Sequence, residues 1–341
     1  LIPAVKAKHP DVLFIAEAIV APVEVIKYFG EDAINAKECE IAYNATFMAL
    51  LWDAVATKKA GLLNLGIRSI PDKLERATWL NYIRCHDDVG LGFDDNDARL
   101  SGYDPLQHRR FLVDYFTGRF PGSPARGLPF GDDIESGDAR ISGALASLAG
   151  LEAALETGDE PLVDEAINVI LLLHGMILSF GGIPLLYYGD AIGTLNSLEY
   201  LEDPSKANDA RWINRSRFDW QKAARRYHSG TVEQRIFTAL KKLIGLRKQT
   251  AAFADFDNRQ LLAVDNPHLF VFSRTDPCNP RSRVLVVANF NGKAQPLALD
   301  RLRAAGFFQG SMMRDLCSGY RVEAVNDTLL VPPFLFYWLV D

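Results

Sequence analysis

An alternation of apolar runs and helical segments, repeated along most of the chain, most constrains how this sequence can fold. Four runs are apolar with little polar alternation, which is typical of strands that are covered on both faces of a parallel sheet. They are DVLFIAEA (11–18), CEIAYN (39–44), WLNYIRCHDD (79–88) and IPLLYYGD (183–190). Three of the four carry carboxylates at their carboxyl ends.

Segments with apolar residues at helical spacing accompany these runs at 45–59, 167–180 and 233–249. Repeated β-α units whose strands end in polar residues predict an α/β fold of the TIM-barrel type. In such barrels the chemistry collects at the carboxyl ends of the strands.

Two further features divide the chain. About eighty residues, rich in glycine and arginine, separate the 79–88 run from the 167–180 helix, where a β-α loop usually has about 2 to 6. This length predicts an inserted subdomain. From about residue 252 short β-rich runs predict an antiparallel β-sandwich. The expected units are 1–90 and 161–251 in the barrel, 91–160 in the insertion and 252–341 in the sandwich.

Composition excludes several classes of function. The formal net charge of -6 and the scattered arginines give no basic surface for nucleic acid. The longest apolar stretch, 167–184, is interrupted by His174, Ser179 and glycines, which is wrong for a bilayer span of about 20 apolar residues. Four cysteines lie far apart without a C-x-x-C pair, so reduced thiols and a cytoplasmic protein are expected.

Glu17 ends an otherwise apolar run, so its carboxyl group should lie partly desolvated at the barrel rim, where a pKa can rise as a general acid requires. A solvated or salt-bridged glutamate is the alternative. His86, Asp87 and Asp88 place an imidazole and two carboxylates together at the end of another run. They could cap a turn, but with Glu17 nearby they match the two-carboxylate arrangement of glycoside chemistry.

Other chemistries find less support in the sequence. One histidine beside several aspartates could hold a cation, but no H-x-x-x-H or EF-type loop is present, and we expect no metal and no cofactor. No G-x-S-x-G elbow indicates Ser-His-Asp hydrolysis. Arg211 in NDARW could clamp a substrate hydroxyl or a carboxylate, or be a plain surface arginine.

The ordered series FIAEAIV, ECEIAYN, MALLWDAVAT, NYIRCHDDVG, ARGLPF, SGDARISG, LLYYGDAIGTLN and DARW resembles the amylosucrases of glycoside hydrolase family 13. The resemblance covers essentially the whole chain. It implies the second half of a (β/α)8 barrel from strand five onward, with the insertion after strand seven.

The resemblance also implies roles for particular residues. Glu17 would be the general acid/base, and Asp87 would stabilise the transition state. The substrate contacts would come from His86, Arg211, Arg140, Arg109 and Asp88, with Asp88 pairing with Arg140. The strand-four aspartate that attacks the anomeric carbon in this family is not present in the chain.

The expected partners follow from the same resemblance. They are sucrose as glucosyl donor, an α-glucan or maltooligosaccharide as acceptor, the missing amino-terminal half of the barrel, and a second copy in a homo-oligomer. The alternatives are a sucrose hydrolase or another α-glucosidase, and an inactive fragment or carbohydrate-binding half-barrel.

Overall fold

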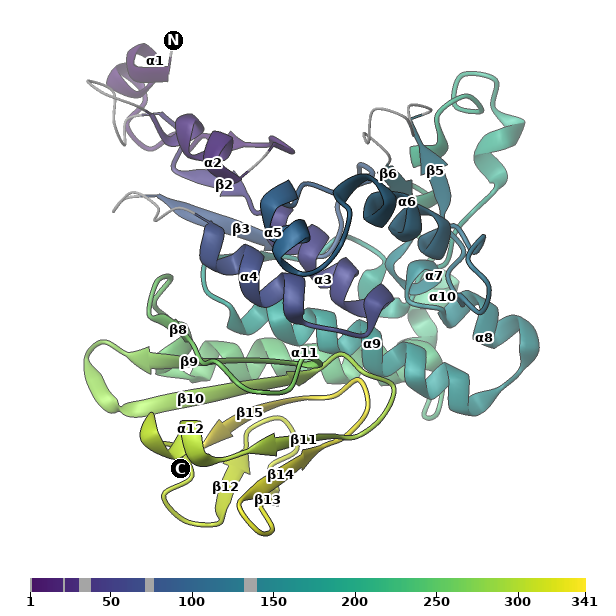
Figure 1. Cartoon of the computed structure of the whole chain (residues 1–341). Coiled ribbons are helices and arrows are strands. Elements are labelled where there is room, and N and C mark those ends of the chain that lie inside the picture. Colours follow the sequence, from purple (N-terminus) through teal and green to yellow (C-terminus); the bar gives the residue numbers. More distant parts are fainter. Residues whose placement is uncertain (1, 21, 31–37, 71–76, 132–139) are drawn as a thin grey trace.

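The computed structural model describes residues 2–20, 22–30, 38–70, 77–131 and 140–341. A parallel sheet, a layer of helices and a pair of antiparallel sheets follow one another across the molecule, and a small fourth sheet lies to one side (Figure 1). Residues 136–139 of the SGDARISG motif lie outside the described residues.

The parallel sheet contains the four predicted runs. Its strands, in spatial order, are β1 (Ile15–Ala16), β2 (Ile41–Tyr43), β3 (Thr78–Tyr82) and β7 (Ile183–Leu185). All three pairings are parallel. Each strand is shorter than its apolar run, so His86 and Asp190 lie in the segments beyond the strand ends. Leu13 and Ile15 are exposed because β1 is an edge strand, which corrects the expectation of two covered faces there.

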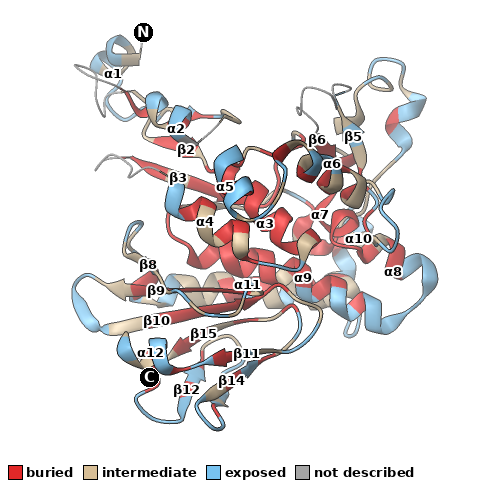
Figure 2. Cartoon of the chain, viewed as in Figure 1, coloured by how far each residue is buried: buried red, intermediate tan, exposed pale blue. Residues whose placement is uncertain are grey.

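Helix α3 (Ala45–Thr57) follows β2, as its apolar spacing predicted. The Asn44 side chain caps its first turn by accepting a hydrogen bond from the Phe47 amide at 3.1 Å. The neighbouring helices are α1 (Ile2–Lys8), α2 (Pro22–Val25), α4 (Gly61–Ser69), α9 (Glu160–Ser179), α10 (Trp220–Ala224) and α11 (Val232–Gln249). Figure 2 shows that α3 and α9 are largely buried.

Helix α9 is long and apolar enough to span a bilayer by length and composition, and 72% of its most apolar window is buried. It packs against α8 and α11 and therefore has the surroundings of a core helix. Gly175 in α9 lets the Phe336 ring approach, because a Cβ at this position would lie 2.5 Å from the ring. The helix thereby contacts the β-rich carboxyl-terminal region directly.

The long segment between β3 and α9, where an insertion was predicted, has a small sheet of its own. It contains a three-stranded antiparallel sheet in the order β4-β6-β5, with short helices beside it. The elements are β4 (Val89–Gly90), α5 (Asp95–Leu100), α6 (Pro105–Phe116), β5 (Leu128–Phe130), β6 (Arg140–Ser142), α7 (Leu145–Leu148) and α8 (Leu151–Thr157).

The carboxyl-terminal region contains the predicted antiparallel sheets. A six-stranded sheet has the order β13-β12-β15-β10-β9-β8, and β11 pairs with β14. The elements are β8 (Arg259–Leu261), β9 (Leu269–Asp276), β10 (Asn279–Asn289), β11 (Gln295–Ala298), α12 (Asp300–Ala304), β12 (Met312–Asp315), β13 (Arg321–Glu323), β14 (Thr328–Val331) and β15 (Phe336–Val340).

Alternation along β9 explains why this sheet is buried on both sides. Leu269 and Val271 face one core, which β11 and β14 complete, while Phe270 and Phe272 face the core that α3 and α9 share. The helices therefore lie between the parallel sheet and the carboxyl-terminal sheets (Figure 1).

Three arginines converge on the carboxyl end of α9. Arg247 donates to the carbonyl oxygens of Leu178 and Gly182 at 2.6 and 3.0 Å, and Arg259 donates to that of Phe180 at 2.8 Å. Arg274, which is fully buried in β9, donates to the Ser179 carbonyl. Cations are favoured at this end of a helix, where carbonyl groups lack partners.

Candidate active site

The loop after β3, residues 83–88, carries three of the predicted site residues, His86, Asp87 and Asp88. Trp52 in α3 donates from Nε1 to the Ile83 carbonyl at 2.8 Å and so fixes the start of this loop. Arg84 donates from Nε and one Nη to Asp190 Oδ1 at 2.9 and 2.7 Å. Both side chains of this pair are buried, with 2% and 3% exposure. The Arg84 guanidinium also lies over the Tyr187 ring at 4.4 Å.

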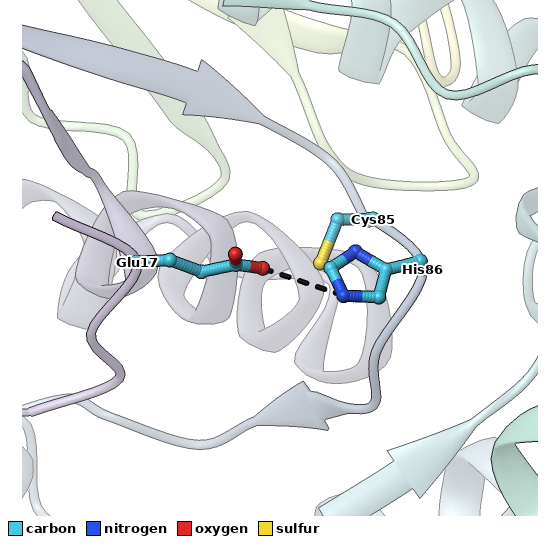
Figure 3. A group of neighbouring side chains, drawn as sticks. All are labelled: Glu17, Cys85 and His86. Atoms are coloured by element: carbon cyan, nitrogen blue, oxygen red, sulfur yellow. Dashed lines mark ion pairs between the residues drawn. The ribbon is translucent and has the colours of Figure 1, made fainter. Parts of the chain in front are cut away.

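Glu17 follows β1 and points toward this loop. Its Oε1 lies 3.6 Å from His86 Nε2, and the buried Cys85 thiol lies beside both groups (Figure 3). The Glu17 side chain is 46% exposed and that of His86 is 49% exposed. Glu17 thus keeps nearly half of its side-chain surface in solvent, and β1, which precedes it, is an outer strand of the described parallel sheet.

Asp87 lies at the centre of a charged network. Its Oδ1 accepts hydrogen bonds from Arg211 at 3.0 Å and from Arg215 at 2.8 Å, and its Oδ2 lies 3.6 Å from His86 Nε2. Arg215 also donates from Nε to the His86 carbonyl at 2.6 Å. Two guanidinium groups thus orient the carboxylate, and one of them fixes the backbone beside it.

Arg211 has a second carboxylate partner. It donates from Nε and Nη2 to the two oxygens of Asp209 at 2.9 and 3.0 Å, a bidentate geometry. These bonds hold the pKa of the Asp209 carboxyl below its usual value. The guanidinium also lies 4.8 Å from the centre of the Phe130 ring in β5, so the insertion contributes a wall to this network.

Asp88 and Arg140 meet as the resemblance implied. Arg140 Nη1 lies 3.5 Å from the buried Asp88 Oδ2. Burial raises the pKa of Asp88, and the Arg140 charge opposes this shift. Arg109 has other contacts: it donates to the carbonyl oxygens of Leu91 and Phe93 at 3.3 and 2.9 Å and pairs with Asp95 at 2.7 Å. Its role in an acceptor subsite stays a prediction.

Several residues of the network were not singled out from the sequence. Arg215 is the residue at the carboxyl end of the 3-10 segment Ala210–Asn214, which contains Arg211, and its contact with Asp87 joins residues far apart in the sequence. Arg84 immediately precedes the predicted group, but its partner Asp190 is distant in sequence. Asp190, the carboxylate that ends the fourth apolar run, is buried against Arg84.

Two neighbouring groups are affected by this charged surrounding. Burial, together with the Glu17 and Asp87 charges, raises the pKa of Tyr43 to about 12. Burial raises the pKa of the Cys85 thiol to about 11, although the Asp87 amide and Arg84 favour the thiolate. Both groups carry their protons at neutral pH, so the negative charge of the site belongs to the carboxylates.

The arrangement can bind a polyhydroxylated ligand and transfer protons. Exposed carboxylate and imidazole groups can bind sugar hydroxyls, and Phe130 and Trp212, both partly exposed, flank the guanidinium groups. Glu17 is accessible for proton transfer to a leaving group, while Asp87 offers a fixed negative charge to a developing cation.

Comparisons with known proteins relate the chain to amylase-type enzymes. Residues 259–338 match the model of the Maltogenic Amylase, C-terminal domain. The relatives found are glycoside hydrolases or transferases of the α-amylase family, so the homologues of this chain are enzymes. Together these findings support a place in the α-amylase family, without singling out the amylosucrases.

Particular relatives span nearly all of the chain. The trehalose synthase/amylase TreS of Mycolicibacterium smegmatis is 22% identical over 364 residues, which cover 98% of this chain and 54% of the relative. The glucosylglycerate phosphorylase of Escherichia coli is 23% identical over 254 residues, covering 73% and 41%. The chain therefore spans about half the length of the curated relatives it matches.

A solved structure of AmyP in complex with maltose is 15% identical, with a TM-score of 0.55, over 96% of this chain and 55% of that one. Another, in complex with maltotriose, is 14% identical with a TM-score of 0.56, covering 95% and 55%. This likeness concerns the fold alone: the structural neighbours are α-amylase-type enzymes, which have a TIM barrel and a carboxyl-terminal β-sheet domain.

Proposed function

We propose that this chain carries the acid/base half of the active site of a retaining α-glucoside-processing enzyme. The observation that carries the proposal is the geometry around His86. Its Nε2 lies 3.6 Å from Glu17 Oε1 and 3.6 Å from Asp87 Oδ2, so two carboxylates flank one imidazole beyond the ends of parallel strands. This is the edge at which barrel enzymes of this type place their chemistry.

In this mechanism Glu17 protonates the leaving oxygen and later removes a proton from the acceptor. Asp87, oriented by Arg211 and Arg215, stabilises the positive charge that develops at the anomeric carbon. His86 contacts the glucosyl hydroxyls. The nucleophile that forms the glucosyl-enzyme comes from outside these residues.

In this proposal the nucleophile comes from the other half of the barrel. β1 and β7 are the outer strands of the described parallel sheet, and both offer a backbone edge for further parallel strands. Exposed apolar side chains beside β1, at Leu13 and Ile15, support the same idea, because pairing there would bury them. A chain without this partner would bind carbohydrate without turning it over.

For the donor we propose sucrose, with transfer of glucose to an α-1,4-glucan and release of fructose. The motif series supports this choice, and a sucrose hydrolase is the close alternative. A second candidate is formation of trehalose, which the trehalose synthase relatives favour because they match over 97–98% of the chain. Maltose or a maltooligosaccharide as ligand is supported by the AmyP complexes.

The test compares donors on the chain assembled with a complementary half-barrel. Fructose release from sucrose supports sucrose as donor, and trehalose formed from maltose supports the second candidate. If the assembled enzyme turns over none of these α-glucosides, the proposal is wrong. The Glu17→Gln variant should lose most activity on sucrose and much less on α-glucosyl fluoride, which needs little protonation.

The control for that variant is Glu24→Gln. Glu24 is an exposed glutamate in α2 that pairs with Lys27 at 2.5 Å, and it lies outside the charged network. It should keep full activity on both donors. Equal losses on sucrose and the fluoride in Glu17→Gln would refute the acid role.

A further inference from the structure

The group Glu17, Cys85 and His86 has a geometry that the acid/base role does not require. One ligand atom from each residue, a carboxylate oxygen, the Sγ and a ring nitrogen, lies within 4.8 Å of the other two. Figure 3 shows the three side chains pointing toward one another from β1's end and from the loop after β3. Glycoside chemistry gives no task to a thiol at this position.

We propose that Glu17, Cys85 and His86 form a binding site for a borderline or soft divalent cation of the Zn²⁺ type. The Glu17 carboxylate, the Cys85 sulfur, whose proton is released to solvent when the cation binds, and one imidazole nitrogen supply three ligands. The fourth position stays open to solvent, since the Glu17 and His86 side chains are both nearly half exposed.

The distances are close to those that such a site needs. Bond lengths of about 2.0 to 2.3 Å place neighbouring ligand atoms of a tetrahedral zinc site about 3.5 Å apart. The 3.6 Å between His86 Nε2 and Glu17 Oε1 already meets this spacing. The remaining separations between ligand atoms are within 4.8 Å. Side-chain rotations that move these atoms by about 1 Å would bring them to the spacing of a zinc site.

The ligand set selects the class of cation. Mg²⁺ and Ca²⁺ require six or more oxygen ligands, whereas a thiolate with an imidazole suits Zn²⁺, Co²⁺ and their neighbours. Cys85 is buried beneath two exposed ligands, so a cation can enter from the solvent side. The sequence did not predict this site because Glu17 lies far from the Cys85-His86 pair along the chain.

Binding has a consequence that rests on the proposed function. A cation on Glu17 occupies the carboxylate that would transfer the proton, so Zn²⁺ should inhibit turnover and a chelator should restore it. Metal supply would then control activity at the acid/base itself.

Cobalt titration of the 341-residue chain tests the site without any activity measurement. Cys278→Ser is the parent background, because Cys278 is the exposed cysteine. We expect one Co²⁺ per chain with a near-ultraviolet thiolate-to-cobalt band, and displacement by Zn²⁺. Cys85→Ser should abolish the band and weaken binding at least about tenfold, since loss of outer-shell partners alone costs that much.

Three further variants keep the test decisive if Cys85→Ser alters the fold. Glu17→Gln and His86→Asn should retain the thiolate band and weaken Co²⁺ binding, while Glu24→Gln should bind as the parent does. A thiolate band that survives in Cys85→Ser, binding without such a band, or unchanged affinity in Glu17→Gln would each overturn the site.

Activity separates this inference from the proposed function. Zn²⁺ binding with inhibition supports both. Zn²⁺ binding that leaves turnover of α-glucosides intact supports the site and refutes the acid role of Glu17. If the parent shows no thiolate-to-cobalt band, the metal site is refuted whatever the activity.

Discussion

The buried ion pair between Arg84 and Asp190 gives the sharpest test of how this site is held. Asp190→Asn removes one charge with almost no change of shape. The Arg84 guanidinium, only 2% exposed, then stays buried with two hydrogen bonds weakened. The loop that bears His86 and Asp87 begins at this pair.

The expected cost follows from burial. Breaking a buried pair by removing one partner costs about 3–5 kcal/mol, because an uncompensated charge remains. Domains are stable by only about 5–15 kcal/mol, so this loss is a large fraction of the total. The double variant Arg84→Met with Asp190→Asn should be more stable than Asp190→Asn alone by at least about 1 kcal/mol, since the orphaned charge is gone.

The assay is urea unfolding followed by far-ultraviolet circular dichroism, with a matched surface pair as control. Arg235 and Asp164 lie 2.5 Å apart but are 34% and 60% exposed. Asp164→Asn should therefore cost no more than about 1 kcal/mol. If Asp190→Asn costs no more than Asp164→Asn, burial does not determine the strength of the pair and the reasoning is refuted.

Three other predictions concern separate parts of the molecule. Burial lowers the pKa of His174 from 6.5 to about 4, so the unfolded chain takes up the proton first as the pH falls. The free energy of unfolding should therefore fall by about 3 kcal/mol between pH 6.5 and 4. His174→Leu should flatten this dependence of stability on pH, and His228→Gln should not. Arg211→Lys should lower kcat/KM for the donor at least about tenfold, because an ammonium cannot make the bidentate bonds, and an unchanged value would contradict this. Arg274→Met should lower the free energy of unfolding by at least about 2 kcal/mol by leaving carbonyls of α9 unsatisfied, and a neutral effect in urea unfolding would contradict the capping role.

Local patterns predicted the elements that depend on local physics. The apolar spacing within α3, α9 and α11 indicated helices because side chains three and four residues apart share a face. The β-rich runs indicated β9 and β10 because alternate side chains of a strand share a face. β12 and β13 were not singled out, since strands of four and three residues contain too few apolar positions to establish a period.

The site was predicted only in part, and the missing part is long-range. Glu17, His86 and Asp87 do come together, as expected from strands that end at one edge of a sheet. Arg215 and the Arg84–Asp190 pair were not predicted, because each depends on contacts between residues more than a hundred positions apart. No period or propensity in the sequence reports such contacts.

The arginines at the end of α9 have a consequence for how the molecule comes apart. Arg259 and Arg274 belong to β8 and β9, yet the carbonyls that they bond belong to a helix behind the parallel sheet. Opening the carboxyl-terminal sheets would therefore uncap α9 and expose the Phe336 contact at Gly175. We expect both regions to exchange their amide hydrogens through one shared opening reaction, as a single cooperative unit.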